Sequence, residues 1–199
     1  MEWNHFLSKL LSISKIGLKF SKDPYALENY QELQDLVILQ SQEVNQPIDV
    51  VKLYPKDTYP TPNVSVRVMI FNDKNQLLMV QEKSDQGYAV PGGWCDVFES
   101  ARQNAIKEAK QETGLDVEVV RLLAVMQREL YKSKPTMISE YVMYFLAEIK
   151  GGTLQFNHEL LDIGFFDYDA LPVLSLKTSK RELDIAMDVI QHRKEVYFD

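Results

Sequence analysis

The chain has 199 residues, of which 45% are hydrophobic and 26% charged, as is typical of a soluble globular protein. The net charge of −7 and the lack of a basic block argue against nucleic acid as the main partner. No apolar run approaches the ~18 residues that a membrane span needs, and the single cysteine, Cys95, excludes an internal disulfide. We therefore expect a cytoplasmic protein with no membrane partner.

Residues 1–60 are predicted to form a helical hairpin followed by a proline-containing linker. Apolar residues recur at helical spacing over residues 3–20 and again after Asp23-Pro24, which provides an N-cap and a proline at N1. Such a hairpin cannot bury its own apolar faces, so it must pack on the rest of the chain or on another copy. A dimerisation or gating element and a structural cap explain it equally well. A further short helix is predicted over Asp49–Tyr54.

Residues 61–199 are predicted to form a second, α/β domain. Val64–Phe71 and Leu77–Gln81 read as the two strands of a hairpin around a turn at 72–76. The remaining predicted elements are strands at Val117–Val120, Leu122–Gln127, Ile138–Ile149 and Gly164–Asp167 and a C-terminal helix over Arg181–His192. Ile138–Ile149 is apolar on both faces, which predicts a central strand.

The stretch VPGGWCDVFESARQNAIKEAKQETGL, residues 90–115, joins a glycine loop to an acidic helix. Ser100 has the spacing of a capping box and Gly114 that of a C′ glycine, so the helix is predicted between them. Glu108 and Glu112 are four residues apart, which places their carboxylates one above the other on one face. Paired carboxylates are ligands for hard divalent cations, although acidic helix faces are also commonly just solvated.

This stretch resembles the Nudix box, G-x5-E-x7-R-E-U-x-E-E-x-G-U, where U is a bulky apolar residue. Gly93, Glu99, Lys107-Glu108, Gln111-Glu112 and Gly114-Leu115 occupy its slots with the full spacing. Lys107 replaces an arginine, and Gln111 replaces the first of the paired glutamates. Lys107 can still pair with Glu99, but not through a bidentate fork.

The resemblance implies a Nudix α/β/α sandwich with a mixed sheet and hydrolysis of a nucleoside diphosphate linked to a group X with Mg²⁺ or Mn²⁺. Flanking stretches, including SKDPYALENYQEL and IGFFDYDALPVLS, resemble the subgroup that acts on ADP-ribose or CDP-choline. Because the apolar residues of the hairpin exceed what two helices can bury and symmetric pairing is the commonest solution, we expect a homodimer formed through the N-terminal helices. The implied partner is thus a small-molecule nucleoside diphosphate conjugate, and nucleic acid is not expected.

The resemblance also assigns candidate roles to residues. Glu108 and Glu112 are the main expected metal ligands, with the Gly93 carbonyl and Gln111 as further oxygens, and Gly92, Glu99 and Lys107 support the motif. The general base is Glu112, Glu140 or Glu159, and a surface or capping carboxylate is the alternative for the last two. The candidate phosphate contacts are Arg67, Gln81 and Arg128, for which a salt bridge on the strand face is an equally good explanation. The candidates for a base or a choline cation are Trp94, Tyr88 and Tyr131, and core packing explains Tyr88 equally well.

Two other functions fit the same sequence. Because Lys107 and Gln111 depart from the motif, the fold can serve a sensor that binds a nucleotide metabolite without cutting it. The helical hairpin also allows an interaction protein with a vestigial catalytic domain. Release of a monophosphate in the presence of metal separates the hydrolase from both.

Overall fold

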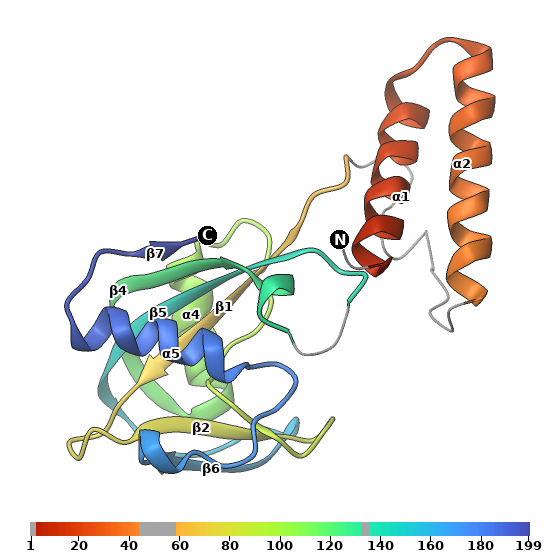
Figure 1. Ribbon diagram of the computed structural model, residues 1–199. Helices are drawn as coiled ribbons and strands as arrows, with labels where there is room; N and C mark the ends of the chain where they lie inside the picture. The colour runs from red at the N-terminus through yellow and green to blue at the C-terminus, as the bar shows by residue number, and fades with distance from the viewer. Residues whose placement is uncertain (1–2, 44–58, 133–135) are drawn as a thin grey trace. The chain divides into compact units, whose positions relative to one another are not determined.

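The computed structural model describes residues 3–43, 59–132 and 136–199. These residues form two compact units, one of N-terminal helices together with the segment around Met137, and one of residues 63–133 and 140–199 (Figure 1). The predicted helix at Asp49–Tyr54 lies outside the described residues. No helix within those ranges is long and apolar enough to cross a membrane.

The first unit is a helical hairpin of α1 (Trp3–Phe20) and α2 (Pro24–Glu43), as predicted. The Asp23 side chain caps α2 by accepting the Ala26 N–H at 3.0 Å, which fits a helix that starts at a proline. Only three apolar side chains of the hairpin are fully enclosed: Leu7, Leu11 and Val37. Such a small core supports the view that the hairpin needs a further surface to pack against.

The second unit contains seven strands and two α-helices among its described residues. They are β1 (Asn63–Ile70), β2 (Leu77–Glu82), β3 (Tyr88–Ala89), α4 (Ala101–Thr113), β4 (Leu115–Gln127), the 3₁₀ turn η1 (Arg128–Leu130), β5 (Glu140–Gly152), β6 (Leu160–Phe166), the 3₁₀ turn η2 (Tyr168–Ala170), α5 (Lys180–Gln191) and β7 (Tyr197–Phe198). One sheet has the order β1-β5-β4-β7, with parallel and antiparallel pairs, and the other is antiparallel with the order β3-β2-β6.

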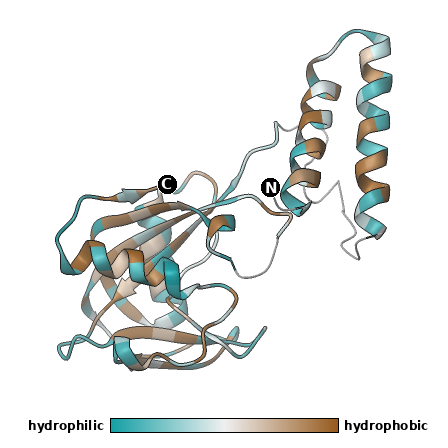
Figure 2. Ribbon diagram, in the orientation of Figure 1, coloured by the Kyte–Doolittle hydropathy of each residue, from teal (hydrophilic) through white to brown (hydrophobic). Residues whose placement is uncertain are grey.

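The larger sheet is covered by a helix on each face, which confirms the predicted α/β/α sandwich. On one face Ala105 and Ala109 of α4 pack with the valines of β1, and on the other Leu183 and Ala186 of α5 pack with Tyr144 of β5. Figure 1 shows α5 in front of this sheet and α4 behind it. In Figure 2 the apolar residues are concentrated on the strands, so the two cores lie where the layers meet.

The local signals in the sequence set both ends of α4. Ser100 and Gln103 form the predicted capping box, and Gly114 closes the helix in the left-handed conformation at φ 73°. β5 lies between β1 and β4, which confirms the central strand. α4 carries Glu108 and Glu112, and β5 begins at Glu140.

Four strand predictions were wrong in detail, one of them being the strand at Gly164–Asp167, because β6 already begins at Leu160 and ends at Phe166. β1 and β2 share a tight turn but enter different sheets, so they form no hairpin beyond a single bridge between Phe71 and Leu77. The two strands predicted between Val117 and Gln127 are one strand, β4, in which register shifts at Val119/Arg121 and Leu122/Ala124 interrupt the alternation. β5 begins two residues later than predicted and runs on through the two glycines, to Gly152.

Candidate active site

The glycine loop at 91–95 runs along the free edge of β1. The N–H groups of Val66 and Val68 donate to the carbonyls of Gly93 and Pro91 at 2.9 and 2.8 Å, respectively. The loop is therefore held in register by the sheet, and its glycines lie at a fixed position next to α4.

The Gly92 residue is held on both sides. Its N–H donates to Glu112 Oε2 at 2.8 Å, and its carbonyl accepts from the buried guanidinium of Arg67. Its φ is +146°, and a Cβ there would collide with the carbonyl of Val66. Only glycine satisfies this position, which fixes the loop against the acidic helix.

Glu108 and Glu112, the acid pair, lie next to this loop. Glu112 is only 6% exposed, and burial raises its pKa to about 7 although the Gly92 N–H and Arg67 favour the charged form. Burial also raises the pKa of Glu108, against the opposing effect of Arg67 and Lys107. A Cβ on Gly93 would lie 2.5 Å from Glu108 Oε1, so the missing side chain leaves room for this carboxylate.

The acid pair fits a divalent cation. Two desolvated carboxylates with raised pKa values gain from a positive charge between them. Within the described ranges, no group of three or more His, Cys, Asp or Glu side chains is arranged to hold a metal by itself. Mg²⁺ is commonly held by one or two carboxylates, with water and substrate phosphate as its other ligands. The predicted further ligands are placed nearby: Gly93 beside Glu108, and Gln111 exposed one turn along α4.

Lys107 forms the ion pair expected in the motif. Its Nζ lies 2.7 Å from Glu99, and it also contacts Asp96, a partner that the sequence analysis did not name. These two carboxylates raise the pKa of Lys107. The lysine therefore ties the loop after Gly93 to α4, as a single ammonium rather than a fork.

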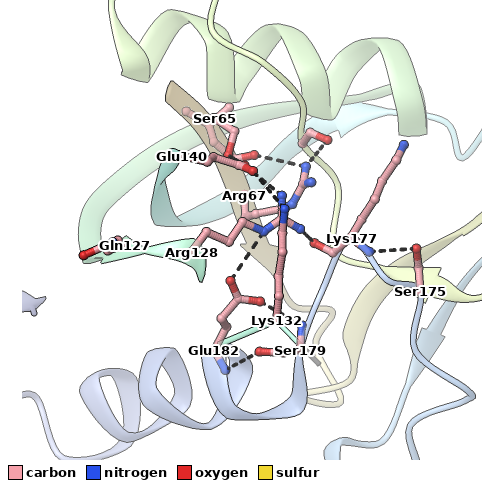
Figure 3. A network of polar contacts seen from close by, with 12 residues as sticks. Ser65, Arg67, Gln127, Arg128, Lys132, Glu140, Ser175, Lys177, Ser179 and Glu182 are labelled. Carbon is pink, nitrogen blue, oxygen red and sulfur yellow. Dashed lines mark hydrogen bonds and ion pairs between the residues drawn. The ribbon is translucent and has the colours of Figure 1, made fainter. Parts of the chain in front are cut away.

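Glu140 lies in a different environment from the acid pair, inside an ion-pair network on the α5 side of the sheet (Figure 3). Its carboxylate pairs with Arg128 at 2.7 Å and accepts from Ser65 at 2.5 Å. Burial tends to raise its pKa, but Arg128 and the other donors outweigh that effect and lower it. A carboxylate held ionised by these partners is poorly suited to take up a proton, so this geometry does not favour Glu140 as general base.

Arg128, a candidate phosphate contact, is committed to the same network. It is 5% exposed, and its guanidinium lies 3.6 Å from Glu182 of α5 and donates to the Lys177 carbonyl. Arg67 is equally enclosed. Both arginines therefore act on protein groups, in contrast to the expected phosphate contacts.

The other candidates are spread around the site. Glu159 is exposed and close enough for its charge to act on Glu108. The Gln81 amide donates to the Gln86 carbonyl at 2.9 Å. Trp94 is half-exposed beside β1. These positions leave Glu159 and Trp94 accessible from solvent.

Two aromatic candidates have protein partners. The Tyr88 hydroxyl donates to Asp162 at 2.8 Å. The buried Tyr131 donates to Asp199, with the Arg181 guanidinium 5.0 Å from its ring centre. Of the three aromatic candidates, Trp94 has the most accessible ring.

The structure adds two charged residues that the sequence analysis missed. Glu82, at the end of β2, is buried and forms an ion pair with Lys177 at 2.6 Å. Its charge raises the pKa of Glu112, so it lies within electrostatic reach of the acid pair. No motif connects Glu82 and Lys177, which are 95 residues apart, so only the fold brings them together.

A NUDIX domain model matches residues 61–186, the part of the chain that contains the glycine loop, the acid pair and the sandwich. The chain belongs to the Nudix family. A second model, described as a UDP-X-like, N-terminal oligomerisation domain, matches residues 1–54. Members of the Nudix family generally use divalent metal ions, which agrees with the acid pair.

Relatives are similar over the whole length of this Nudix hydrolase. The putative ADP-ribose pyrophosphatase YjhB of Bacillus subtilis is 33% identical over 203 residues, covering 100% of this chain and 97% of the relative. A crystal structure of a UDP-X diphosphatase superimposes with a TM-score of 0.66 at 30% identity, covering 98% of this chain and 96% of that one. An ADP-ribose pyrophosphatase from Streptococcus suis gives a TM-score of 0.62 at 34% identity, over 70% of this chain and 100% of that one.

Proposed function

We propose that this Nudix hydrolase cuts the pyrophosphate bond of a nucleoside diphosphate linked to a group X, of the ADP-ribose or CDP-choline type, and releases a nucleoside monophosphate. The observation that carries the proposal is the desolvated acid pair, Glu108 and Glu112, held beside a glycine loop. The names of the full-length relatives, an ADP-ribose pyrophosphatase and a UDP-X diphosphatase, support this substrate class.

We propose Mg²⁺ or Mn²⁺ as the cofactor, held by Glu108 and Glu112. A bound divalent cation neutralises phosphate charge and lowers the pKa of water. Glu112, which is buried and accepts a hydrogen bond from the Gly92 N–H, is the first candidate to accept a proton from the attacking water. Glu159 is the second candidate base, since it is exposed and its charge raises the pKa of Glu108. The Gly92 contacts of Arg67 and Glu112 keep the loop in place while the substrate binds.

A panel of substrates tests the proposal. ADP-ribose, CDP-choline, UDP-sugars and dGTP are incubated with and without Mn²⁺, and the rate and products are measured by chromatography. We expect metal-dependent release of AMP or CMP, with a higher kcat/KM for the conjugates than for dGTP. A triphosphate ranked first would move the protein to a different substrate class. Binding of a conjugate with no product would favour the sensor function.

We propose that residues 1–60 assemble a homodimer and residues 61–199 catalyse. The hairpin exposes a large set of apolar side chains: Trp3, Phe6, Ile13, Phe20, Tyr25, Leu36 and Leu39. The match to an oligomerisation domain over 1–54 supports the same assignment. Symmetric pairing is the commonest way for a soluble chain to cover such a surface. Light scattering at micromolar concentration should give twice 23.1 kDa, whereas a monomer would contradict the assignment.

Cys95 supports the cytoplasmic location that we propose. Its free thiol is half-buried in the loop after Gly93. Burial and the nearby charge of Glu108 raise its pKa, which keeps it protonated. A protonated thiol is a poor nucleophile, so Cys95 has the properties of a structural residue in a reducing compartment.

A further inference from the structure

The proposed substrate brings a charged pyrophosphate to a site that already carries several carboxylates. Besides the acid pair, Glu82, Asp96 and Glu159 have charges that act on Glu108 or Glu112. A pyrophosphate in this field needs protein cations as well as metal to offset the repulsion. Any side-chain cation that can reach the pyrophosphate is therefore a candidate for this role.

Two of the nearby cations are already committed to protein groups. Arg67 is 3% exposed and donates to the Gly92 carbonyl. Lys107 is paired with two carboxylates, Glu99 and Asp96. If Arg67 turned to a ligand, it would release the glycine loop. If Lys107 did so, it would break the motif ion pair that positions the site.

Lys177 differs from both, because its backbone is fixed while its ammonium is accessible. Its N–H donates to Ser175 Oγ at 3.1 Å, and its carbonyl accepts from the buried Arg128. Its side chain is 46% exposed, in contrast to 6% for that of its partner Glu82. The network of Arg128 thus holds the loop, and the long side chain is free to change its partner.

The Lys177 ammonium lies beside Glu82, a carboxylate whose charge acts on Glu112 of the acid pair. In Figure 3 its side chain runs from the loop before α5 toward the ribbon of α4. Its Nζ lies 2.6 Å from Glu82, which is anchored at the end of β2 where its N–H donates to the Gly87 carbonyl at 2.9 Å. Glu82 in turn lies close enough to Glu112 for its charge to raise the pKa of Glu112. Lys177 is therefore the exposed partner of a buried carboxylate that acts on the acid pair.

We propose that Lys177 is a substrate-binding residue, whose ammonium exchanges Glu82 for the pyrophosphate of the nucleoside diphosphate conjugate. This assignment rests on the proposed function and extends it to a residue outside the Nudix box. The exchange leaves the buried Glu82 without its cation, so the contact of the ammonium with the more highly charged pyrophosphate must outweigh the loss of this ion pair. The Arg128 network serves as the support that fixes the starting point of the Lys177 side chain.

The first test compares Lys177→Ala with Lys150→Ala. Lys150 is a matched control, because its side chain is 48% exposed and pairs with Glu148 and Glu118 at 2.8 and 3.2 Å. We expect Lys177→Ala to lower kcat/KM for the conjugates by roughly 10–100-fold, the scale of a lost hydrogen bond to a charged group. Lys177→Arg should keep part of the activity, and Lys150→Ala should behave as wild type. Equal activity of the two alanine variants would overturn the assignment.

A second test separates substrate binding from a purely structural pair with Glu82. If Lys177 only neutralises Glu82, the double variant Glu82→Gln/Lys177→Ala removes both charges and should recover activity. If Lys177 contacts pyrophosphate, the double variant stays as impaired as Lys177→Ala. Recovery in the double variant would refute the proposed contact.

A third measurement does not depend on turnover. Inorganic pyrophosphate binding is measured by calorimetry with Mg²⁺ present, for wild type and for Lys177→Ala. We expect the dissociation constant to rise about tenfold or more in the variant, with no change in Lys150→Ala. An unchanged constant would reject Lys177 as a ligand even if the enzyme hydrolyses conjugates. A raised constant, with no hydrolysis by the wild type, would instead support the contact and reject the proposed reaction.

Discussion

The acid pair and Glu140 lie in the same unit but differ in the sign of their pKa shifts. The acid pair, Glu108 and Glu112, lies next to the glycine loop, and burial raises the pKa of both carboxyls. Glu140, in the network with Arg128, is more enclosed, yet its pKa is lowered. The difference comes from partners, because Glu140 has a guanidinium at 2.7 Å and the acid pair lacks a close ion-pair partner among the described residues.

This contrast separates a structural group from a functional one. A carboxylate that is fully paired inside the protein stabilises the fold and has no capacity left for a ligand. A desolvated carboxylate without such a partner costs stability until a cation or a proton arrives. The predictions below test each side of this comparison.

The largest effect on stability is expected for Arg128→Ala. Removing this side chain leaves Glu140 and Glu182 buried without their guanidinium, which costs about 3–5 kcal/mol of unfolding free energy. Denaturant unfolding followed by circular dichroism measures the change. Arg102→Ala is the control, since this exposed arginine makes one bond, to the Val119 carbonyl at 2.7 Å, and should cost only about 1 kcal/mol. Equal losses in the two variants would show that the network contributes no more than a surface contact.

The largest effect on catalysis is expected for Glu112→Gln. The amide keeps the size of the side chain but removes the charge and the basic oxygen, so kcat should fall by at least ~10²-fold. Steady-state kinetics with saturating Mn²⁺ measures the loss. The fold should remain intact, because no ion pair of Glu112 is broken. Near-normal turnover in this variant would remove Glu112 from the active site.

The stability of the metal-free protein should depend on pH through Glu112. Its folded-state pKa of about 7 lies above the ordinary value of 4.5, so folding favours the protonated form. The resulting stabilisation is fully present below pH about 4.5 and is lost as the pH rises through about 7, by an amount on the order of 3 kcal/mol. Glu140 has the opposite sign, because its pKa is lowered and its stabilisation is lost only in more acidic solution.

Thermal melts between pH 4.5 and 8 in EDTA measure this dependence for wild type and Glu112→Gln. The wild type should lose stability relative to the variant across that range. Adding Mn²⁺ at pH 8 should raise the melting temperature of the wild type more than that of the variant, since the cation replaces the proton. Parallel curves for the two proteins would mean that the Glu112 carboxyl has an ordinary pKa.

The same contrast explains what could be predicted from the sequence. The acid pair is local, because Glu108 and Glu112 lie on one helix whose ends are set by Ser100 and Gly114. Periodicity and capping rules therefore predict it without the fold. The side-chain partners of Glu140 are Ser65 of β1, Arg128 of η1 and Lys132 after η1, and no spacing rule connects Ser65 to Glu140. Glu140 was accordingly predicted to be a candidate base, although its position in the network does not favour that role.

Local sequence rules could not predict the sheet topology either. The Asn72–Gln76 turn was predicted correctly, with the Asn72 N–H donating to the Gln76 carbonyl at 3.1 Å. The turn does not decide whether the next strand pairs with the previous one. β1 instead pairs with β5, in a register that places Asn63 opposite Glu140, and this long-range choice creates the edge along which the glycine loop lies. The ion pair between Glu82 and Lys177 also depends on this topology.

The smallest expected effect is that of Gln111→Glu. Gln111 occupies the Nudix-box slot of the first paired glutamate, and it is exposed three residues after Glu108 on α4. A carboxylate there adds a charged oxygen on the turn that carries the acid pair. We expect the Mn²⁺ concentration for half-maximal activity to fall severalfold, with little change in kcat at saturating metal.

Gln103→Glu is the matched control for this variant. It adds the same charge to the same helix, and a glutamate keeps the capping box that Gln103 forms with Ser100. A general electrostatic attraction of metal would lower the half-maximal concentration equally in both variants. A fall specific to Gln111→Glu would mean that position 111 faces the metal. An unchanged or raised requirement would mean that Gln111 takes no part in metal binding and that the acid pair, with water and substrate, supplies the ligands without it.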